Sequence, residues 1–307
     1  MKQLLAWIAA LFGGKKKPPV VIAPPPPIPA PLPPPEPVPI NIWPDRRAIG
    51  MIMLSNYQTW TGTDNYMNGS ADFDTWLQQH ANNCIATLKS WNAQGAIIWD
   101  PEGSKFPRAY TYYGDPKLTP EKVDPFFTLL KDAGFRVGVC LRPDIIIMTM
   151  NPPDAANWAG METPDHYVAA SPLQDLISKV EYARKRWGCS LFYVDSNVGA
   201  GMTPGSKNTI GSGGLISASV FEQLHKLYPD CLFIPEWHDL TYEASTALYW
   251  HKGWEPPNIK GLAVIDAGDT YWTQDQLNAA VKNGHILMGR AWWGPEIPMI
   301  KQAYEDK

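Results

Sequence analysis

Short apolar runs alternate with amphipathic stretches from about residue 47 to the end of the chain. Seven runs have the continuous apolar character of strands that are buried on both faces. They span residues 48–54, 95–99, 136–141, 190–195, 231–235, 261–265 and 285–290. The amphipathic stretches between them predict helices at 74–92, 119–133, 171–187, 217–228 and 273–283.

Glycine and proline support these helix boundaries. Gly134, Gly188 and Gly284 each stand between a predicted helix and the next strand, where a residue in the left-handed conformation commonly ends a helix. Thr119 followed by Pro120 is typical of a helix start. Helices that alternate with buried strands predict a parallel sheet with both faces covered.

The order of elements predicts an α/β fold, a TIM-type (β/α) barrel of seven or eight parallel strands. Seven strands are one short of the common number, so we expect an eighth strand near residues 38–43 or after Trp250. An open doubly wound sheet is the alternative, but no G-x-G-x-x-G motif follows the first strand. Loops at the carboxyl ends of barrel strands form active sites, so residues directly after the strands are the first candidates.

Acidic residues stand where the second to sixth predicted strands end. They are Asp100, Glu102, Asp144, Asp195, Glu236, Asp266 and Asp269. A single acid at such a place is more often a helix cap or an ion-pair partner. Their recurrence at one end of a barrel instead predicts a common acidic mouth.

Two of these acids fit the chemistry of glycoside cleavage, in which one carboxylate attacks or stabilises the sugar centre and the other protonates the leaving oxygen. The strands that end at Asp195 and Glu236 are predicted neighbours, about 4.8 Å apart, which suits the ~5–5.5 Å separation of a retaining pair. Ser196 and Asn197 give Asp195 polar neighbours that favour its ionised form. Proline and tryptophan flank Glu236 and favour a general acid. Asp266 is the third catalytic candidate.

Other residues at the strand ends are predicted to bind the sugar. This set is Asp100, Glu102, Arg142, Asp144, Asn197, Trp237, His238, Arg290, Trp292 and Trp293. Arginine binds hydroxyl or carboxylate oxygens, although Arg142 and Arg290 are equally suited to pair with Glu236 as structural residues. Tryptophan rings in loops suit the flat faces of sugars.

Composition limits the classes of ligand and cofactor that we expect. The net charge is −4, and the 26 Lys and Arg residues form no basic stripe, so nucleic acid is not expected. The 14 Trp and 13 Tyr residues favour a carbohydrate ligand. Neither the histidines nor the cysteines have metal-site spacing, so we expect no metal and no other cofactor. Cys84, Cys140, Cys189 and Cys231 are predicted buried thiols; a Cys189–Cys231 disulfide is the alternative, because both begin neighbouring strands.

The front of the chain differs from the barrel. Residues 1–14 are an apolar segment, which is either a signal-peptide region or a short helix that docks on a membrane surface or a partner protein. Residues 15–44 are rich in Lys and Pro, with 14 prolines from residue 18 onward, and predict an extended spacer. The barrel is therefore assigned to residues 45–307. A secreted, surface-anchored or virion-associated location is favoured over a free cytoplasmic one.

The strand ends resemble those of barrel glycoside hydrolases. An Asp after strand four and a Glu after strand five resemble the alpha-amylase clan, whereas an Asp after strand four and another after strand six resemble the alpha-galactosidase clan. Three features depart from these patterns: Tyr193 replaces the amylase arginine, no His-Asp pair follows strand seven, and no Lys precedes Asp195.

A more specific resemblance covers most of residues 95–245. The stretches IIWDPEGSKFPRAYTYYGDP, RVGVCLRPD, FYVDSN and LFIPEWHDLTY are similar to a group of uncharacterised bacterial barrel proteins of the glycosidase type. These resemblances imply a glycoside hydrolase. Two other classes stay open: a non-catalytic carbohydrate-binding or structural barrel of a virion or cell surface, and a metal-dependent barrel hydrolase.

Overall fold

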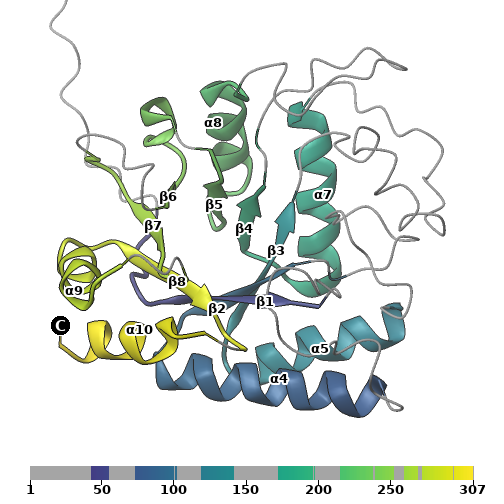
Figure 1. Cartoon of the computed structure of the whole chain (residues 1–307). Helices are drawn as coiled ribbons and strands as arrows, with labels where there is room; N and C mark the ends of the chain where they lie inside the picture. The colour runs from purple at the N-terminus through teal and green to yellow at the C-terminus, as the bar shows by residue number, and fades with distance from the viewer. Residues whose placement is uncertain are drawn as a thin grey trace, which may run out of the picture. The chain divides into compact units, whose positions relative to one another are not determined.

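The computed structural model describes residues 43–54, 73–99, 101, 119–141, 172–195, 197, 215–237, 239–251, 259–268, 272–292 and 294–306. In this part of the chain, eight parallel strands form one sheet with helices outside it (Figure 1). The predicted apolar segment and almost all of the predicted proline-rich spacer lie outside the described residues.

The eight strands form a nearly closed barrel. They are β1 (Ile49–Met53), β2 (Gly95–Trp99), β3 (Arg136–Leu141), β4 (Leu191–Val194), β5 (Leu232–Pro235), β6 (Leu248–Trp250), β7 (Ala263–Asp266) and β8 (Ile286–Arg290). Neighbours are parallel in the order β5-β4-β3-β2-β1-β8-β7-β6. Between the two ends of this order, the backbone N–H of Ala247 donates to the carbonyl of Phe233 at 3.0 Å.

The predicted barrel is therefore confirmed, with eight strands. The strand that we had not placed is β6, which ends at Trp250 and does not follow it. Three residues are too few to show the length and pattern by which a buried strand is recognised. As a consequence, the strands predicted as sixth and seventh are β7 and β8.

The helices agree with the pattern of apolar positions. They are α4 (Phe73–Ser90), α5 (Pro120–Asp132), α7 (Pro172–Trp187), α8 (Ala218–Leu227), α9 (Gln274–Lys282) and α10 (Glu296–Glu305), with a short 3-10 turn η3 (Leu240–Tyr242). The first five were predicted to within two residues at each end, and α10 was missed. Gly134, Gly188 and Gly284 have φ of +89°, +75° and +82°, which confirms the left-handed helix ends that were predicted for them.

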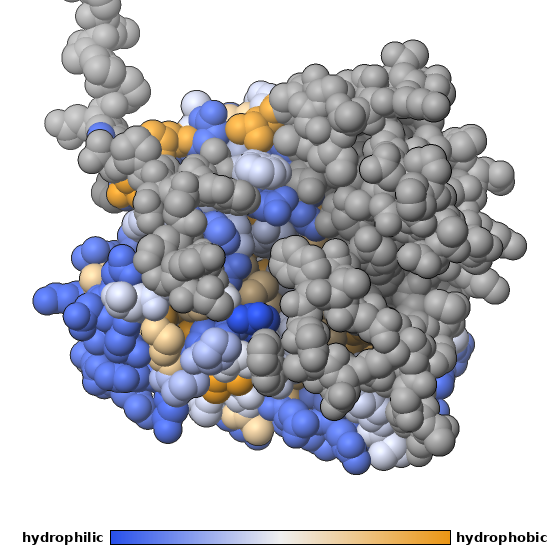
Figure 2. Space-filling model, viewed as in Figure 1, coloured by the Kyte–Doolittle hydropathy of each residue, from blue (hydrophilic) through white to orange (hydrophobic). Residues whose placement is uncertain are grey.

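Apolar side chains fall into an outer and an inner layer. The outer layer joins strands to helices, for example Phe192 to helical Leu176 and Leu224, and the outward faces of α9 and α10 are hydrophilic (Figure 2). The inner layer contains strand residues and their immediate neighbours; among them are Ile49, Ile97, Cys140, Leu191, Tyr193, Leu232, Ile234, Tyr249, Val264, Ile286 and Met288. This layer fills the barrel interior, so the period of two along each strand decides which later residue faces the mouth.

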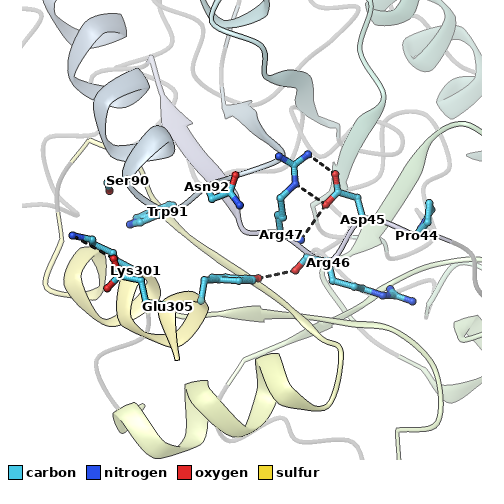
Figure 3. A pocket seen from close by; sticks show the side chains of 10 residues that line it. Pro44, Asp45, Arg46, Arg47, Ser90, Trp91, Asn92, Lys301 and Glu305 are labelled. Atoms are coloured by element: carbon cyan, nitrogen blue, oxygen red, sulfur yellow. Dashed lines mark hydrogen bonds and ion pairs between the residues drawn. The ribbon is translucent and has the colours of Figure 1, made fainter. Parts of the chain in front are cut away.

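The amino-terminal end of the barrel holds the chain that leads into β1. Trp43 is buried in the inner layer, two residues before the predicted start of the barrel, and its Nε1 donates to Gln94 Oε1 at 2.7 Å. Asp45 forms ion pairs of 2.7 Å with both Arg47 and Arg136. A cavity of about 700 Å³ lies here, opposite the strand-end acids, and its walls carry paired charges such as Arg47 with Asp45 (Figure 3).

Asp45 should make stability depend on pH. Burial alone would raise the pKa of Asp45, but hydrogen bonds from Arg47 and Arg136 lower it from 3.8 to about 2. Because the folded pKa is depressed, the stabilisation is present above about pH 4 and is lost as the pH falls toward 2. We expect Asp45→Asn to reduce the free energy of unfolding by about 1 kcal/mol at pH 7.

Urea unfolding of both proteins between pH 7 and pH 3 measures this effect. The difference between the two proteins should shrink in the acid range. A difference that stays constant down to pH 3 would contradict the assignment of the stabilisation to the Asp45 carboxylate.

Candidate active site

The inward-facing residues at the carboxyl ends of β4 to β8 are polar, and we call this set the polar ring. Side chains on alternate residues face the barrel interior, so the ring lies two positions beyond the inner-layer residues Tyr193, Ile234, Tyr249, Val264 and Met288. The residues at those positions are Asp195, Glu236, His251, Asp266 and Arg290. The structure thus brings all three predicted catalytic acids to one end of the barrel, on its inner side.

Asp195 and Glu236 stand at the same level on neighbouring strands. Val194 of β4 pairs in register with Pro235 of β5, and each acid is the next residue. The backbone N–H of Glu236 donates to the carbonyl of Val194 at 3.0 Å, which extends the ladder to the acids. Asp195 is buried, with Cys140 Sγ at 3.9 Å from its Oδ2, and Glu236 is half-buried. The predicted adjacency of the two strands is confirmed.

Two tyrosines lie directly below the acids. Tyr193 and Tyr249 are 5% and 6% exposed, and their rings meet edge to face at 5.3 Å between centroids. Burial raises the pKa of both phenols well above the ordinary value, and the neighbouring acids raise it further. Because the raised pKa keeps both hydroxyls protonated at neutral pH, these side chains are neutral hydrogen-bond donors there.

Asp266 is the acid whose contacts are most completely defined. Its Oδ2 accepts from the hydroxyl of Tyr249 at 2.5 Å, and its Oδ1 accepts from the backbone N–H of Gly268 at 2.9 Å. Burial raises the pKa of Asp266, while these two hydrogen bonds and the nearby His251 oppose the rise. Trp272 Nε1 donates to the Asp266 carbonyl at 2.7 Å and holds the backbone. The carboxyl group is therefore fixed in one orientation.

Arg290, a predicted sugar-binding residue, is held by a buried acid. Its Nε lies 2.6 Å from Glu296 Oε1 and its Nη2 lies 3.1 Å from Glu296 Oε2. Nη2 also donates to the carbonyl of Gly268 at 2.9 Å. Glu296 is 1% exposed. The two-point ion pair joins the end of β8 to α10, and the bond to Gly268 joins it to the loop after β7. A bidentate carboxylate is the partner expected for an arginine with a structural role.

Asn197, also predicted to bind sugar, links the loops that follow β4 and β5. Its Oδ1 accepts from the backbone N–H of Trp237 at 2.7 Å, and its Nδ2 donates to the Trp237 carbonyl at 2.9 Å. Asn197 is fully buried, and its own carbonyl accepts from Ile216 N–H at 3.0 Å. Because Asn197 is two residues after Asp195 and Trp237 is next to Glu236, the amide fixes one acid relative to the other.

We expect Asn197→Ala to lower the free energy of unfolding by about 1–3 kcal/mol, because both backbone groups of Trp237 lose their partner. Chemical denaturation measures the change. Asn82→Ala is the matched control, since that amide is exposed on α4 and its Oδ1 lies 3.5 Å from Gln78 Nε2; it should change stability by less than about 0.5 kcal/mol. Equal losses in the two variants would contradict the linking role.

The predicted aromatic residues differ in exposure. Trp237 is 39% exposed at the end of β5, and Leu240, three residues later, is 43% exposed. Trp292 is half-buried against the outer layer, with its ring 6.4 Å from that of His80. Burial lowers the pKa of His80 to about 4, so this histidine is a neutral packing partner. Of the two predicted sugar-binding tryptophans that the structure describes, Trp237 has the exposed surface that a sugar ring requires.

Several predicted residues lie outside the described part of the chain: Asp100, Glu102, Arg142, Asp144, His238, Asp269 and Trp293. Conversely, Tyr249 and His251 were missed because β6 was missed. An apolar or aromatic residue followed two positions later by a polar one was the available signal, as it is for Tyr193 and Asp195.

The four cysteines are buried free thiols, so the alternative disulfide between Cys189 and Cys231 is not formed. Within the described residues, no three His, Cys, Asp or Glu side chains form a group suited to a metal ion. None of the helices in those same segments is both long enough and apolar enough to cross a membrane.

The corrected strand count changes the position of Asp266 relative to the two glycosidase clans. Asp266 ends strand seven, not strand six. The second Asp of the alpha-galactosidase pattern is therefore not matched at strand six, where His251 follows β6. The alpha-amylase clan pattern has a His-Asp pair at the end of strand seven. Strand seven of this chain ends in Ile265 and Asp266, so the aspartate is present and an isoleucine stands in place of the histidine.

Comparison with known proteins supports the fold. No protein-family model and no curated protein matches the chain. Isomalto-dextranase from Arthrobacter globiformis T6, solved with panose, has a TM-score of 0.50 at 10% identity, over 84% of this chain and 56% of that one. Alpha-L-fucosidase isoenzyme 1 from Paenibacillus thiaminolyticus has a TM-score of 0.49 at 12% identity, over 85% and 73%.

An alpha-galactosidase from Lactobacillus brevis has a TM-score of 0.46 at 11% identity, over 85% of this chain and 40% of that one. The chain thus spans about half the length of the isomalto-dextranase and less of the alpha-galactosidase. These solved neighbours are glycoside hydrolases, and at such identities a likeness establishes the backbone architecture. The chain therefore has the (β/α) barrel fold that isomalto-dextranase also has.

Proposed function

We propose that this chain is a glycoside hydrolase that cleaves a polysaccharide or oligosaccharide with Asp195 and Glu236. The observation that carries the proposal is the register of β4 and β5, which places both acids side by side on the inner face of the barrel mouth. Active sites of this barrel class are built at that end of the strands. The barrel fold shared with a solved isomalto-dextranase is compatible with the proposal.

In this proposal, Asp195 attacks the anomeric carbon and Glu236 protonates the leaving oxygen. Neighbouring strands are about 4.8 Å apart, which favours the short carboxyl separation of a retaining enzyme over the longer one that leaves room for a water. In the second step, Glu236 returns as a base and takes a proton from the water that releases the sugar. Asp266, held by Tyr249 and Gly268, is a fixed third acid at the same end of the barrel.

Trp237 is the proposed sugar platform next to the reacting bond. It directly follows Glu236 in the chain, is 39% exposed, and has its backbone held at both ends by Asn197. A partly exposed aromatic side chain on a fixed backbone can stack on a sugar face with little further ordering of the loop.

The test is a screen of the purified full-length chain against a panel of polysaccharides, with Asp195→Asn assayed beside it. We expect the unaltered chain to release sugar from at least one of them and the variant to release none. Proton NMR of the first product should show the anomeric configuration of the substrate. Equal release by both proteins would exclude Asp195 from the mechanism.

The second candidate function is a carbohydrate-binding or structural barrel without catalysis. The exposed side chains of Trp237 and Leu240 at the end of β5 favour a binding surface of some kind. Binding of a glycan by the unaltered chain and by Asp195→Asn, with no release of sugar by either, would favour this function. Loss of that binding in Trp237→Ala would place the glycan at the barrel mouth.

We also propose that residues 1–42 attach the barrel to a membrane surface or a particle and keep it at a distance. The support is the composition: an apolar segment with Trp7 and Phe12, followed by a proline-rich spacer. Deletion of residues 1–42 keeps Trp43, which packs in the inner layer. The shortened chain should keep its thermal stability and sugar release and lose its attachment, which co-sedimentation with vesicles or particles measures. Loss of folding would contradict the spacer role.

A further inference from the structure

We infer that Tyr249 is a positioning residue that holds Asp266 in the polar ring as a hydrogen-bond-accepting carboxylate. The ring of Tyr193, on β4, supports the ring of Tyr249. The inference rests on the proposed function only for its consequence in catalysis. The contacts themselves belong to the barrel interior and have consequences that are measurable without any substrate.

The geometry directs the Tyr249 hydroxyl at Asp266. This hydroxyl donates to Asp266 Oδ2 at 2.5 Å. The ring of Tyr193 lies edge to face against Tyr249 and 5.0 Å from the ring of Trp99. Each ring is therefore held by its neighbours, and the proton of Tyr249 is directed toward Asp266.

Asp266 is suited to accept and not to donate. Tyr249 fills one carboxyl oxygen and Gly268 N–H fills the other, and both groups have a proton to give. A carboxylate that accepts from two fixed donors is stabilised relative to the protonated acid, so both hydrogen bonds oppose the rise that burial causes in the pKa of Asp266. Loss of the Tyr249 hydroxyl should therefore move the equilibrium of Asp266 further toward the protonated acid.

Charged groups from four places in the described residues act on Asp266 or on its partners. His251 at the end of β6 favours the carboxylate, and Glu296 of α10 disfavours it. Arg290 of β8 pairs with that Glu296, which reduces the repulsion. From β5, Glu236 acts on the hydroxyl of Tyr249. Only Tyr249 and Gly268 contact the carboxyl oxygens of Asp266 through hydrogen bonds that the structure defines, and of these only Tyr249 can be changed without altering the backbone.

The test is Tyr249→Phe, which removes the hydroxyl and keeps the ring. The pKa of Asp266 is measured by ¹³C NMR of its carboxyl carbon, with the signal assigned through Asp266→Asn. We expect the pKa to rise by about one unit or more, which corresponds to loss of one hydrogen bond to a charged group. An unchanged or lower pKa would overturn the inference, whether or not the protein cleaves sugars.

The same variant has a separate readout in catalysis. On a substrate found in the screen, the acid limb of the pH–activity profile should move to higher pH by a similar amount, because a carboxylate that activity requires is protonated sooner. A shift of the basic limb with the acid limb fixed would mean that Asp266 is the proton donor and would overturn the assigned role.

Two variants protect this test against a simple structural defect. Tyr193→Phe removes the other buried hydroxyl below the acids and keeps both the ring contact with Tyr249 and the Tyr249–Asp266 hydrogen bond, so it should raise the pKa of Asp266 by less than Tyr249→Phe does. Tyr228→Phe removes a hydroxyl that donates to Glu181 Oε1 at 3.1 Å, at the other end of the barrel. That control should leave the pKa of Asp266 and the pH profile unchanged, and an equal shift there would contradict a local effect.

Discussion

Glu236→Gln is expected to lose about 10²–10⁴-fold in turnover on natural glycosides while it keeps most of its activity on an aryl glycoside with a good leaving group. A general acid is needed to protonate a poor leaving oxygen, and an activated phenol departs without that proton. Asp195→Asn should lose turnover on both kinds of substrate, because the carboxylate that attacks the sugar is needed whatever leaves. The ratio of the two activities therefore assigns a role to each acid.

The measurement is kcat on a matched pair of substrates that differ only in the leaving group. Asn197→Ala serves as a control, because it disturbs the distance between the acids without removing either and should reduce both activities together. If Glu236→Gln lost both activities equally, Glu236 would have a structural role and Asp266 would become the candidate for the proton donor.

The barrel itself was predictable because its strands and helices follow local rules. Seven strands are continuous apolar runs, and the glycines that end the helices stand directly before strands. The exception, β6, has only three residues, Leu248–Trp250. Because this strand was not predicted, Tyr249 and His251 were overlooked and Asp266 was assigned to strand six in place of strand seven.

The acids at the strand ends were predictable, whereas their partners were not. Asp195, Glu236 and Asp266 follow apolar runs, and a barrel gathers such residues at one end. The contact of Asn197 with Trp237 joins residues 40 positions apart in the chain, and Arg290 meets Glu296 through α10, a helix that was not predicted. A residue type that suits sugar binding also suits these internal bonds, and only the folded chain distinguishes the two uses.

The pair of Arg290 and Glu296 should be the most costly interaction to break. Glu296→Gln removes the Glu296 carboxylate from the Arg290 guanidinium, whose side chain is 21% exposed, and Arg290→Met removes the Arg290 cation from the buried Glu296 carboxylate. We expect either change to lower the free energy of unfolding by about 3–5 kcal/mol. The double variant should lose less than the sum of the two, because each single variant already loses the same pair interaction.

Lys301 and Glu305 provide a control on the same helix. Their ion pair is 3.6 Å long and exposed, at 50% and 62% of the two side chains, so Glu305→Gln should cost less than about 0.5 kcal/mol. Thermal and urea unfolding of the five proteins measures the comparison. Similar losses in Glu296→Gln and Glu305→Gln would contradict it. Gly294 gives an independent check, since a side chain there would meet the Glu296 carboxylate and its φ is +154°; Gly294→Ala should therefore weaken the same pair from the backbone side.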